Sequence, residues 1–401
     1  MSADSRMRIA IFSRYNLADQ VLLAPELKPM LALLSRTADI FSMSMQGKGL
    51  GDLAGIHIEI EAMRLQYDRA SARDIQLKTV ALYARLPGIA KRLRAFRPRL
   101  IFLVDNMPLF GWLLKRLSRA PVATMYGDWS FHNMFERKRW ARPFLKALEA
   151  VDRYEMRRLD GFFCRAASAK ERLVSWGIRP DLVRVVRDAP DPAVFFPQDQ
   201  RALRQRCGFT DQDVVLSFHG VMHQGKGLDH LIGWANDLHR EDSRIGLLLI
   251  GTGPEEGNLR RLAEGLPLGR KCFFTGWLAS LREVGMYCNA GDICIAMRTA
   301  SEANQGIVPG ALLHGMACRQ VAVAPRLRGT SEIVEHGRNG YLFEAGNGED
   351  FKKVIRSLAA NRGAWEAVAG QAFEDIQRDY SVEAAARKYA EALSHFAAVR
   401  K

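Results

Sequence analysis

The stretch VVLSFHGVMHQGKG, residues 214–227, decides the fold class of this chain. Its first five residues form a mostly apolar run with the length of a buried strand, and the glycines after them lead into a helical pattern over 227–239. A strand that turns through glycines into a helix is the first half of a βαβ unit. The sequence therefore predicts an α/β protein with parallel sheets.

The same alternation continues on both sides of this stretch. We expect upstream strands over 8–12, 38–43, 56–60, 100–104, 122–126 and 161–164, with helices over 75–95 and 134–158. Downstream we expect strands over 245–250, 272–275, 293–297 and 321–324, with helices over 255–264, 279–289 and 309–317. Two Rossmann-like domains, with parallel sheets facing across a cleft that holds the ligands, are the simplest interpretation.

A proline-rich segment separates the two series of elements. Three prolines lie between Asp188 and Pro197, where they disfavour continuous helix or sheet. We place a first domain at 1–195, a second at 196–375 and a helix at 376–401. Composition leaves open whether that helix packs back on the first domain.

Composition excludes several classes of protein. Of the 401 residues 48% are hydrophobic and 25% charged, enough to build a core and unlike a disordered chain. The six cysteines form no C-x-x-C pair, which favours reduced thiols over a disulfide framework or a zinc site. Asp105, Asn106 and Pro108 interrupt the apolar stretch 101–114, and we recognise neither a membrane span nor a secretory signal. We therefore expect a cytoplasmic protein.

The net charge of +14 is concentrated in the first half, where residues 1–200 hold 33 basic and 21 acidic side chains. The helix predicted over 134–158 places Trp140, Phe144, Leu148 and Val151 on one face among basic residues, unless it breaks at Pro143. That face either packs on the core or meets an anionic membrane surface. No nucleic-acid-binding motif accompanies the charge, so we expect no nucleic-acid partner.

Three turns could hold an anionic ligand. Around Gly220, Gly225 and Lys226, backbone amides and an ammonium could bind a phosphate, although Gly227 replaces the Ser or Thr of a Walker loop. Gly251 and Gly253 form a second turn between strand and helix. An architectural role for each turn remains open.

The third turn runs from Ser301 to the helix over 309–317. The amides around Gly306, Ile307, Val308 and Gly310 precede or open that helix, and could hold a diphosphate without a metal. The alternative is a core helix after a long loop, in which Glu302 and His314 have no role in binding.

Taken together, these segments resemble a known family. The stretches 220–227, 251–255, 274–277, 290–292, 316–318 and 329–342 occur in the order and spacing of the donor domain of GT-B glycosyltransferases. The likeness is to the retaining family-4 type, also called the glycosyltransferase 1 group, over about 214–350. The first half resembles the family's acceptor domain only in outline, through 155–161, 167–168 and 188–197.

The resemblance implies a hexosyl transfer from a nucleotide-diphosphate sugar to a glycan or lipid-linked acceptor, with retention at the anomeric carbon. Such an enzyme would build a surface polysaccharide or glycolipid without metal or cofactor, in the cytoplasm or peripherally at the inner face of the membrane. The alternatives are a non-catalytic homologue that binds a nucleotide sugar or a partner, or a GT-B epimerase or phosphorylase.

The family's motifs assign residues in the second domain. Lys226 matches the lysine that neutralises the diphosphate, whereas the partner arginine is replaced by Val221, so that Arg298, Arg326 or Arg328 would have to substitute. The family's two glutamates fall at Gly306 and His314, with Glu302 twelve residues before His314. Asn304 matches an asparagine of some members. His314 would contact the ribose through one hydrogen bond.

The first domain also departs from the family pattern. Tyr126 occupies the place of a family histidine, which leaves Asp128 and His132 as nearby polar candidates, and Asp105 follows the preceding strand. We take Lys226, Glu302, Asp128 and His132 as catalytic candidates, and Tyr126 and Asp105 as acceptor-side candidates. Turn capping or core hydrogen bonding is the alternative for the residues of the first domain.

Overall fold

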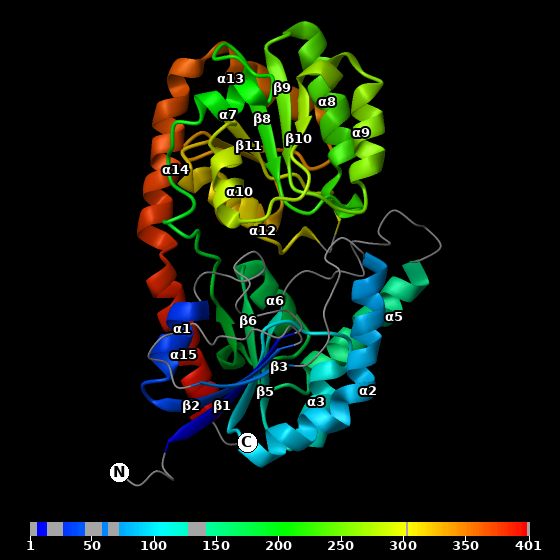
Figure 1. Cartoon of the computed structure of the whole chain (residues 1–401), viewed down its shortest axis with the longest axis vertical. Coiled ribbons are helices and arrows are strands. Elements are labelled where there is room, and N and C mark those ends of the chain that lie inside the picture. Colours follow the sequence, from blue (N-terminus) through cyan, green and yellow to red (C-terminus); the bar gives the residue numbers. More distant parts are fainter. Residues whose placement is uncertain are drawn as a thin grey trace. The chain divides into compact units, whose positions relative to one another are not determined.

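The computed structural model describes residues 6–13, 27–44, 58–62, 72–126, 142–301 and 304–398, with backbone alone at 44, 58–62, 72–79 and 142. These residues form two compact units (Figure 1). The first contains the described residues before 190 together with 382–398, and the second contains 190–381. The boundaries expected from the sequence were 195 and 375. Every strand pairing within the two sheets is parallel, which confirms the predicted α/β class.

The first unit is built on a seven-stranded sheet in the order β3-β2-β1-β4-β5-β6-β7. Its strands are β1 (Met7–Ser13), β2 (Ala38–Ser44), β3 (Ile58–Ala62), β4 (Leu100–Leu103), β5 (Val122–Tyr126), β6 (Gly161–Cys164) and β7 (Val183–Val185). Its helices are α1 (Leu27–Leu34), α2 (Ala72–Phe96), α3 (Phe110–Ser118), α5 (Arg142–Met156), α6 (Ala167–Ser175), the 3-10 turn η3 (Pro180–Leu182) and α15 (Val382–Ala398).

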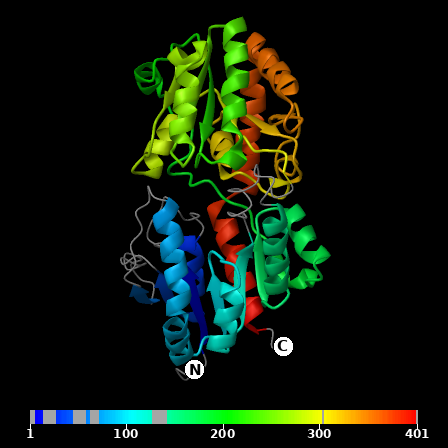
Figure 2. The ribbon, with the colours of Figure 1, turned by 90° about the vertical axis from the view of Figure 1, so that its right-hand side faces the viewer.

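Helix α15 belongs to the first unit although it follows the second unit in sequence. It packs against α1 and β4 (Figure 2). Tyr389 of α15 is fully buried with its ring centroid 4.8 Å from that of Phe163. Phe396 lies over Gly161, where a side-chain Cβ would come within 2.6 Å of the ring. The first sheet is therefore covered on this side by α15.

The second unit is built on a six-stranded sheet in the order β10-β9-β8-β11-β12-β13. Its strands are β8 (Val214–His219), β9 (Ile245–Ile250), β10 (Cys272–Phe274), β11 (Ile293–Ile295), β12 (Val321–Pro325) and β13 (Tyr341–Phe343). Its α-helices are α7 (Arg201–Arg206), α8 (Leu228–Glu241), α9 (Glu256–Glu264), α10 (Leu281–Cys288), α11 (Gly310–Ala317), α12 (Arg328–Ser331), α13 (Gly348–Ala360) and α14 (Trp365–Asp379). Its 3-10 turns are η4 (Gln224–Lys226), η5 (Pro267–Lys271) and η7 (Arg362–Ala364).

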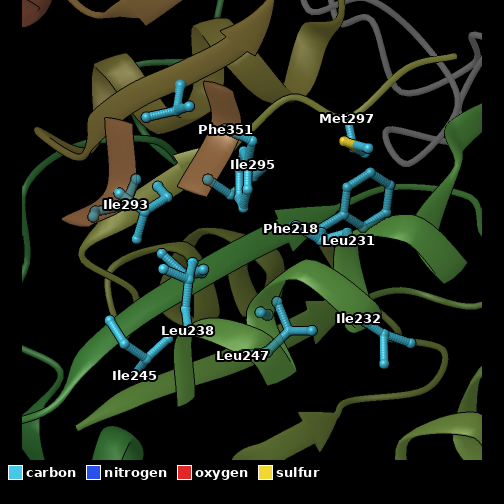
Figure 3. Packing of buried hydrophobic residues seen from close by; sticks show 14 of the residues in the cluster. Phe218, Leu231, Ile232, Leu238, Ile245, Leu247, Ile293, Ile295, Met297 and Phe351 are labelled. Atoms are coloured by element: carbon cyan, nitrogen blue, oxygen red, sulfur yellow. The ribbon is translucent and has the colours of Figure 1, made fainter. Parts of the chain in front are cut away.

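The core of the second unit lies between its strands and the helices α8 and α13. Phe218 of β8, Leu247 of β9 and Ile295 of β11 pack with Leu231 of α8 and Phe351 of α13 (Figure 3). Each of these side chains is at most 1% exposed. Burying such a side chain contributes roughly 1.5–3 kcal/mol, so this core holds the carboxyl ends of β8 and β11 in fixed positions.

The structure differs from the sequence prediction in the basic helix of the first unit. Helix α5 begins at Arg142, with Pro143 in its first turn, and residues 134–141 and the Trp140 side chain lie outside the described residues. Of the two alternatives for that face, core packing does not describe Phe144, which is 47% exposed. Among the described helices, none combines the length and the apolar character needed to cross a membrane.

Candidate active site

The strand order of the second unit has a topological switch point at the carboxyl ends of β8 and β11, and we call the space outside it the crevice. The chain leaves β8 toward β9 on one side, whereas β11 lies on the other side of β8. The loops after β8 and β11 therefore diverge, and ligands of open α/β sheets bind in the crevice between such loops. Here these are the segments 220–227, 296–301 and 304–309, which carry most of the donor-binding candidates.

Backbone and side-chain hydrogen bonds join these two segments. The carbonyl oxygen of Gly225 accepts from the Thr299 backbone N–H at 3.1 Å and from Asn304 Nδ2 at 3.3 Å. Asn304 Nδ2 also lies 2.8 Å from Thr299 Oγ1, and Asn304 Oδ1 accepts from Arg298 at 3.2 Å. Asn304 is fully buried. It therefore shapes the loop that carries Lys226, and does not itself present a surface to a ligand.

The glycines of the first two turns meet through their backbones. The Gly220 N–H donates to the Ile250 carbonyl at 2.9 Å, and the Met222 N–H donates to that of Thr252 at 2.9 Å. A Cβ on Gly251 would come within 2.5 Å of the Gly220 carbonyl oxygen. Gly251 also has φ 117°, a region that favours glycine. A Cβ on Gly253 would likewise collide with the Met222 backbone. Close packing of the two turns thus accounts for both glycines.

The loop before α11 is fixed by the short helix α12. The Gly329 N–H donates to the Gln305 carbonyl at 2.7 Å, and a Cβ on Gly329 would collide with the backbone of Ile307. Val308 is buried, whereas Gly306 is partly exposed next to it. Pro309 caps α11 in an extended conformation, and the Leu312 N–H donates to the Pro309 carbonyl at 3.0 Å, which leaves the amides of Gly310 and Ala311 without acceptors within the helix. This N-terminus can receive an anion.

His314 on α11 and His219 at the end of β8 lie close together. Their ring centroids are 5.2 Å apart. Phe195, which is buried, stacks on His314 with centroids 3.8 Å apart and ring planes 4° apart. The Nδ1 atoms of both histidines are buried and have no hydrogen-bond partner among the described residues. The rings link the strand end to the helix that follows β11.

Burial holds both imidazoles in their neutral form. Burial, with a smaller effect from the positive charge of Lys226, lowers the pKa of His219 to about 4. Burial likewise holds the pKa of His314 well below its ordinary value, with a smaller effect from His219. The influence of Lys226 on His219 indicates that the ammonium lies near this ring.

The three arginines considered as substitutes for the missing family arginine have different environments. Val221, at the family arginine's place, is 58% exposed. Arg298 is buried with Asn304, Arg326 pairs with Glu344 at 2.8 Å, and the backbone N–H of Arg328 donates to Gln305 at 3.3 Å. Arg326 is therefore engaged on the surface rather than in the crevice loops.

The first unit has a crevice of the same kind between β1 and β4. Ser13 Oγ, at the end of β1, donates to Asp105 Oδ1 at 3.4 Å, so Asp105 lies at this position. Tyr126 ends β5 and is 9% exposed, with its ring edge-on to Trp176 at 5.8 Å. Burial raises the pKa of Tyr126. The phenol of Tyr126 therefore belongs to the core and is little exposed to a ligand.

Three catalytic candidates, Asp128, His132 and Glu302, lie outside the described residues. Within the part of the chain that the structure describes, no three His, Cys, Asp or Glu side chains gather as a metal site would require. The chemistry that the described crevice offers is electrostatic: an ammonium, a helix N-terminus and two neutral imidazoles.

Comparison with known proteins supports this architecture. Residues 213–361 match the family model of glycosyl transferases group 1. The chain has the GT-B fold, and a domain within its second unit, residues 213–361, is similar to group 1 glycosyltransferases. That domain contains both loops of the crevice and the whole of α11.

Solved structures cover both units. Anabaena Alr3699/HepE, in complex with UDP and glucose, is similar with a TM-score of 0.73 and 17% identity over 97% of this chain and 100% of that one. Sucrose-phosphate synthase from Thermosynechococcus elongatus is similar with a TM-score of 0.75 and 15% identity over 97% and 99%. At these identities the likeness concerns the fold.

Curated relatives match part of the chain. The D-inositol 3-phosphate glycosyltransferase of Rhodococcus jostii is 28% identical over 205 residues, 49% of this chain and 44% of that protein. A GDP-mannose-dependent mannosyltransferase of Mycolicibacterium smegmatis, which acts on a phosphatidylinositol monomannoside, is 29% identical over 199 residues, 48% and 50% of the two chains. The chain thus spans about half the length of these relatives.

Sequence reasoning missed two residues of the group 1 domain's crevice. His219 is the last residue of β8, and only the spatial proximity of His314 distinguishes it. Phe195 lies in the proline-rich segment that we interpreted as a linker. The only sequence feature that could have predicted its burial is that Phe195 is a large apolar residue within this segment.

Proposed function

We propose that this protein is a retaining glycosyltransferase that moves a hexosyl group from a nucleotide-diphosphate sugar to a glycan or lipid-linked acceptor. The product would be a surface polysaccharide or a glycolipid, and the reaction would need neither metal nor cofactor. The group 1 domain and relatives that act on inositol phosphate or phosphatidylinositol derivatives support this proposal.

One observation carries the proposal: Lys226, the N-terminus of α11 and the loop anchored by Asn304 meet at the edge of a single sheet. The influence of Lys226 on His219, and the contact of His219 with His314, connect these elements. An ammonium and free helix amides are the groups that stabilise charge on a departing diphosphate. The acceptor hydroxyl would attack on the face from which the diphosphate leaves.

The roles of the donor and acceptor candidates follow from this proposal. Lys226 would neutralise the diphosphate, and the amides near Gly306 and Gly310 would bind its oxygens. Asp105, at the crevice of the first unit, is the described acceptor-side candidate, and Tyr126 would act through packing. Glu302, Asp128 and His132 remain proposed catalytic residues.

Binding of UDP-, GDP-, ADP- and dTDP-sugars tests the proposal, followed by transfer to lipid and glycan extracts in the presence of EDTA. Lys226→Ala should weaken binding about 10-fold to 100-fold, because a hydrogen bond to a charged group contributes about 1.5–3 kcal/mol. Lys353→Ala is the matched control, since Lys353 is exposed on α13. Absence of binding across the panel would contradict the proposal, and binding without transfer would favour the non-catalytic homologue.

We also propose that the first unit attaches to anionic membranes. Helices α3 and α5 lie side by side, and the ring centroids of Trp112 on α3 and Tyr154 on α5 are 5.6 Å apart. They expose apolar side chains beside basic ones: Leu117, Phe144 and Tyr154, with Arg116, Arg119, Lys146, Arg153, Arg157 and Arg158. A basic side chain near an anionic surface contributes about 1 kcal/mol.

Sedimentation with vesicles of phosphatidylcholine, with and without phosphatidylglycerol, tests the attachment. The double variant Arg116→Ala/Leu117→Ala should weaken binding to the anionic vesicles. The double variant Arg261→Ala/Leu262→Ala, an exposed Arg-Leu pair on α9 of the second unit, should leave it unchanged. Equal binding to neutral vesicles, or equal loss in both variants, would refute the attachment.

A further inference from the structure

The crevice of the second unit contains a pair of histidines, of which the family motifs account only for His314, as a ribose contact, and not for its neighbour His219. We propose that His219 and His314 act together as uncharged N–H donors to the diphosphate of a bound sugar nucleotide. They would partly replace the family arginine, whose place Val221 takes in this chain. This inference rests on the proposed function and adds a ligand-contacting residue, His219, to it.

The environment of the rings decides which nitrogen carries the proton. Nδ1 of both rings is buried without a hydrogen-bond partner among the described residues. A neutral imidazole has one N–H and one lone pair, and a buried unmet N–H is rarer than a buried unmet acceptor. The proton therefore belongs on Nε2 of each ring. Both residues are partly exposed, and of the ring nitrogens only Nδ1 is among the buried atoms without a partner, which leaves the Nε2–H groups for a ligand.

The direction of these groups favours the diphosphate. The charge of Lys226 contributes to the low pKa of His219, so the two side chains are near each other. A ligand oxygen bound by the ammonium would therefore also lie near this ring. His314 turns back along α11, with Cε1 3.8 Å from the position that a Cβ on Gly310 would take. It therefore lies beside the free amides that open α11. The two rings, the ammonium and the helix N-terminus surround one anion site.

Phe195 is the positioning residue of the pair. It stacks on His314 with ring planes 4° apart and brings no charge. The segment that carries it is anchored on the second unit: the Gln198 N–H donates to Asn289 at 2.9 Å, and Asn289 donates to the Phe196 carbonyl at 3.1 Å. The ring of His314 is thus held by a segment outside its own helix.

The charged groups acting on the pair predict a distinctive pH dependence. Lys226 from η4 acts on His219, and His219 from β8 acts on His314. Uncharged donors give an affinity for a sugar nucleotide that does not change between about pH 5.5 and 8, where its diphosphate diester keeps one charge state. Cationic histidines would instead give an affinity that falls as the pH rises through about 6.5.

The test is calorimetric binding of whichever of UDP-glucose, GDP-mannose, ADP-glucose or dTDP-glucose binds the full chain. His219→Phe and His314→Phe keep a ring but remove the N–H, and each should weaken binding about 10-fold to 100-fold. His314→Gln restores an amide donor and should recover most of the loss. His395→Phe is the matched control, because His395 is exposed on α15 of the first unit.

The outcomes separate this inference from the proposed function. If Lys226→Ala weakens binding while both phenylalanine variants bind like the wild type, the histidine pair is refuted and the proposed function stands. If the wild type loses affinity as the pH rises and the variants lose that dependence, the rings are cations and the inference is wrong. If none of the four sugar nucleotides binds, both fail. Where a phenylalanine variant does not fold, a wild-type affinity that falls as the pH rises through about 6.5 still refutes the inference, and His314→Gln, which keeps a donor, still tests it by binding nearly as tightly as the wild type.

Discussion

Replacing Asn304 by alanine should loosen the loop that carries Lys226. Asn304 Nδ2 lies 2.8 Å from Thr299 Oγ1, 3.1 Å from the Thr299 carbonyl oxygen and 3.3 Å from the Gly225 carbonyl oxygen. An amide nitrogen has two hydrogens, so at most two of these contacts are strong at once. The variant would leave these acceptors, and Arg298, without their amide partner in a fully buried place.

The expected loss follows from these contacts. A net contribution of about 1 kcal/mol for each hydrogen bond, and about 1–3 kcal/mol for each buried group left unmet, gives about 2–4 kcal/mol of local stability. Amide hydrogen exchange within residues 220–228 should then accelerate about 30-fold to 1000-fold, provided that exchange proceeds by local opening. Affinity for a sugar nucleotide should fall as well, because Lys226 would lose its fixed position.

Two further variants make the experiment decisive. Asn304→Asp keeps the shape and the acceptor for Arg298 but lacks the N–H donors, so it should accelerate exchange in the same direction. Asn258→Ala removes an exposed asparagine of α9 and should have no effect at residues 220–228. Unchanged exchange in Asn304→Ala, or the same acceleration in Asn258→Ala, would refute this reasoning.

Two other predictions concern stability. Burial raises the pKa of Glu155 to about 7, against hydrogen bonds donated by the backbone of Trp112 and Leu109, and burial also raises that of Asp152 to about 7. Between about pH 4.5 and 7 the folded state keeps these protons, whereas the unfolded state has lost them. The free energy of unfolding should therefore fall as the pH rises through this range, by about 3 kcal/mol for Glu155. Urea unfolding should show a flatter pH profile in Glu155→Gln; an unchanged slope would contradict this. In Gly251→Ala the new Cβ would collide with the Gly220 carbonyl, and the free energy of unfolding should fall by about 1–3 kcal/mol. Gly257→Ala is the control, because no atom lies within 4 Å of its Cβ position and the protein should not be destabilised. Equal melting temperatures for the two variants would refute the collision.

Much of the fold could be predicted because long apolar strands alternate with helices. The strands expected over 122–126, 161–164 and 245–250 have exactly those bounds in the structure. The strands β7 and β13 were missed, because three residues are too few to establish a periodicity. The strand expected over 293–297 ends at Ile295, and the burial of Ala296 and Met297 in the loop after it explains why they read as part of the apolar run.

The candidate site was less accessible to sequence reasoning. The glycine turns and Lys226 were found because turn residues between a strand and a helix leave a local pattern. The partnership of His219, His314 and Phe195 left no such pattern, because it joins residues from three separate segments. The buried role of Asn304 also depends on hydrogen bonds between loops that spacing alone does not reveal.

The position of α15 has a consequence for how the protein is made. The ribosome completes all of residues 190–381 before it supplies the helix whose Tyr389 fills the core of the first unit. During synthesis the second unit can mature while the first still presents an open apolar sheet. A nascent chain stalled before residue 382 should therefore recruit chaperones to its N-terminal half.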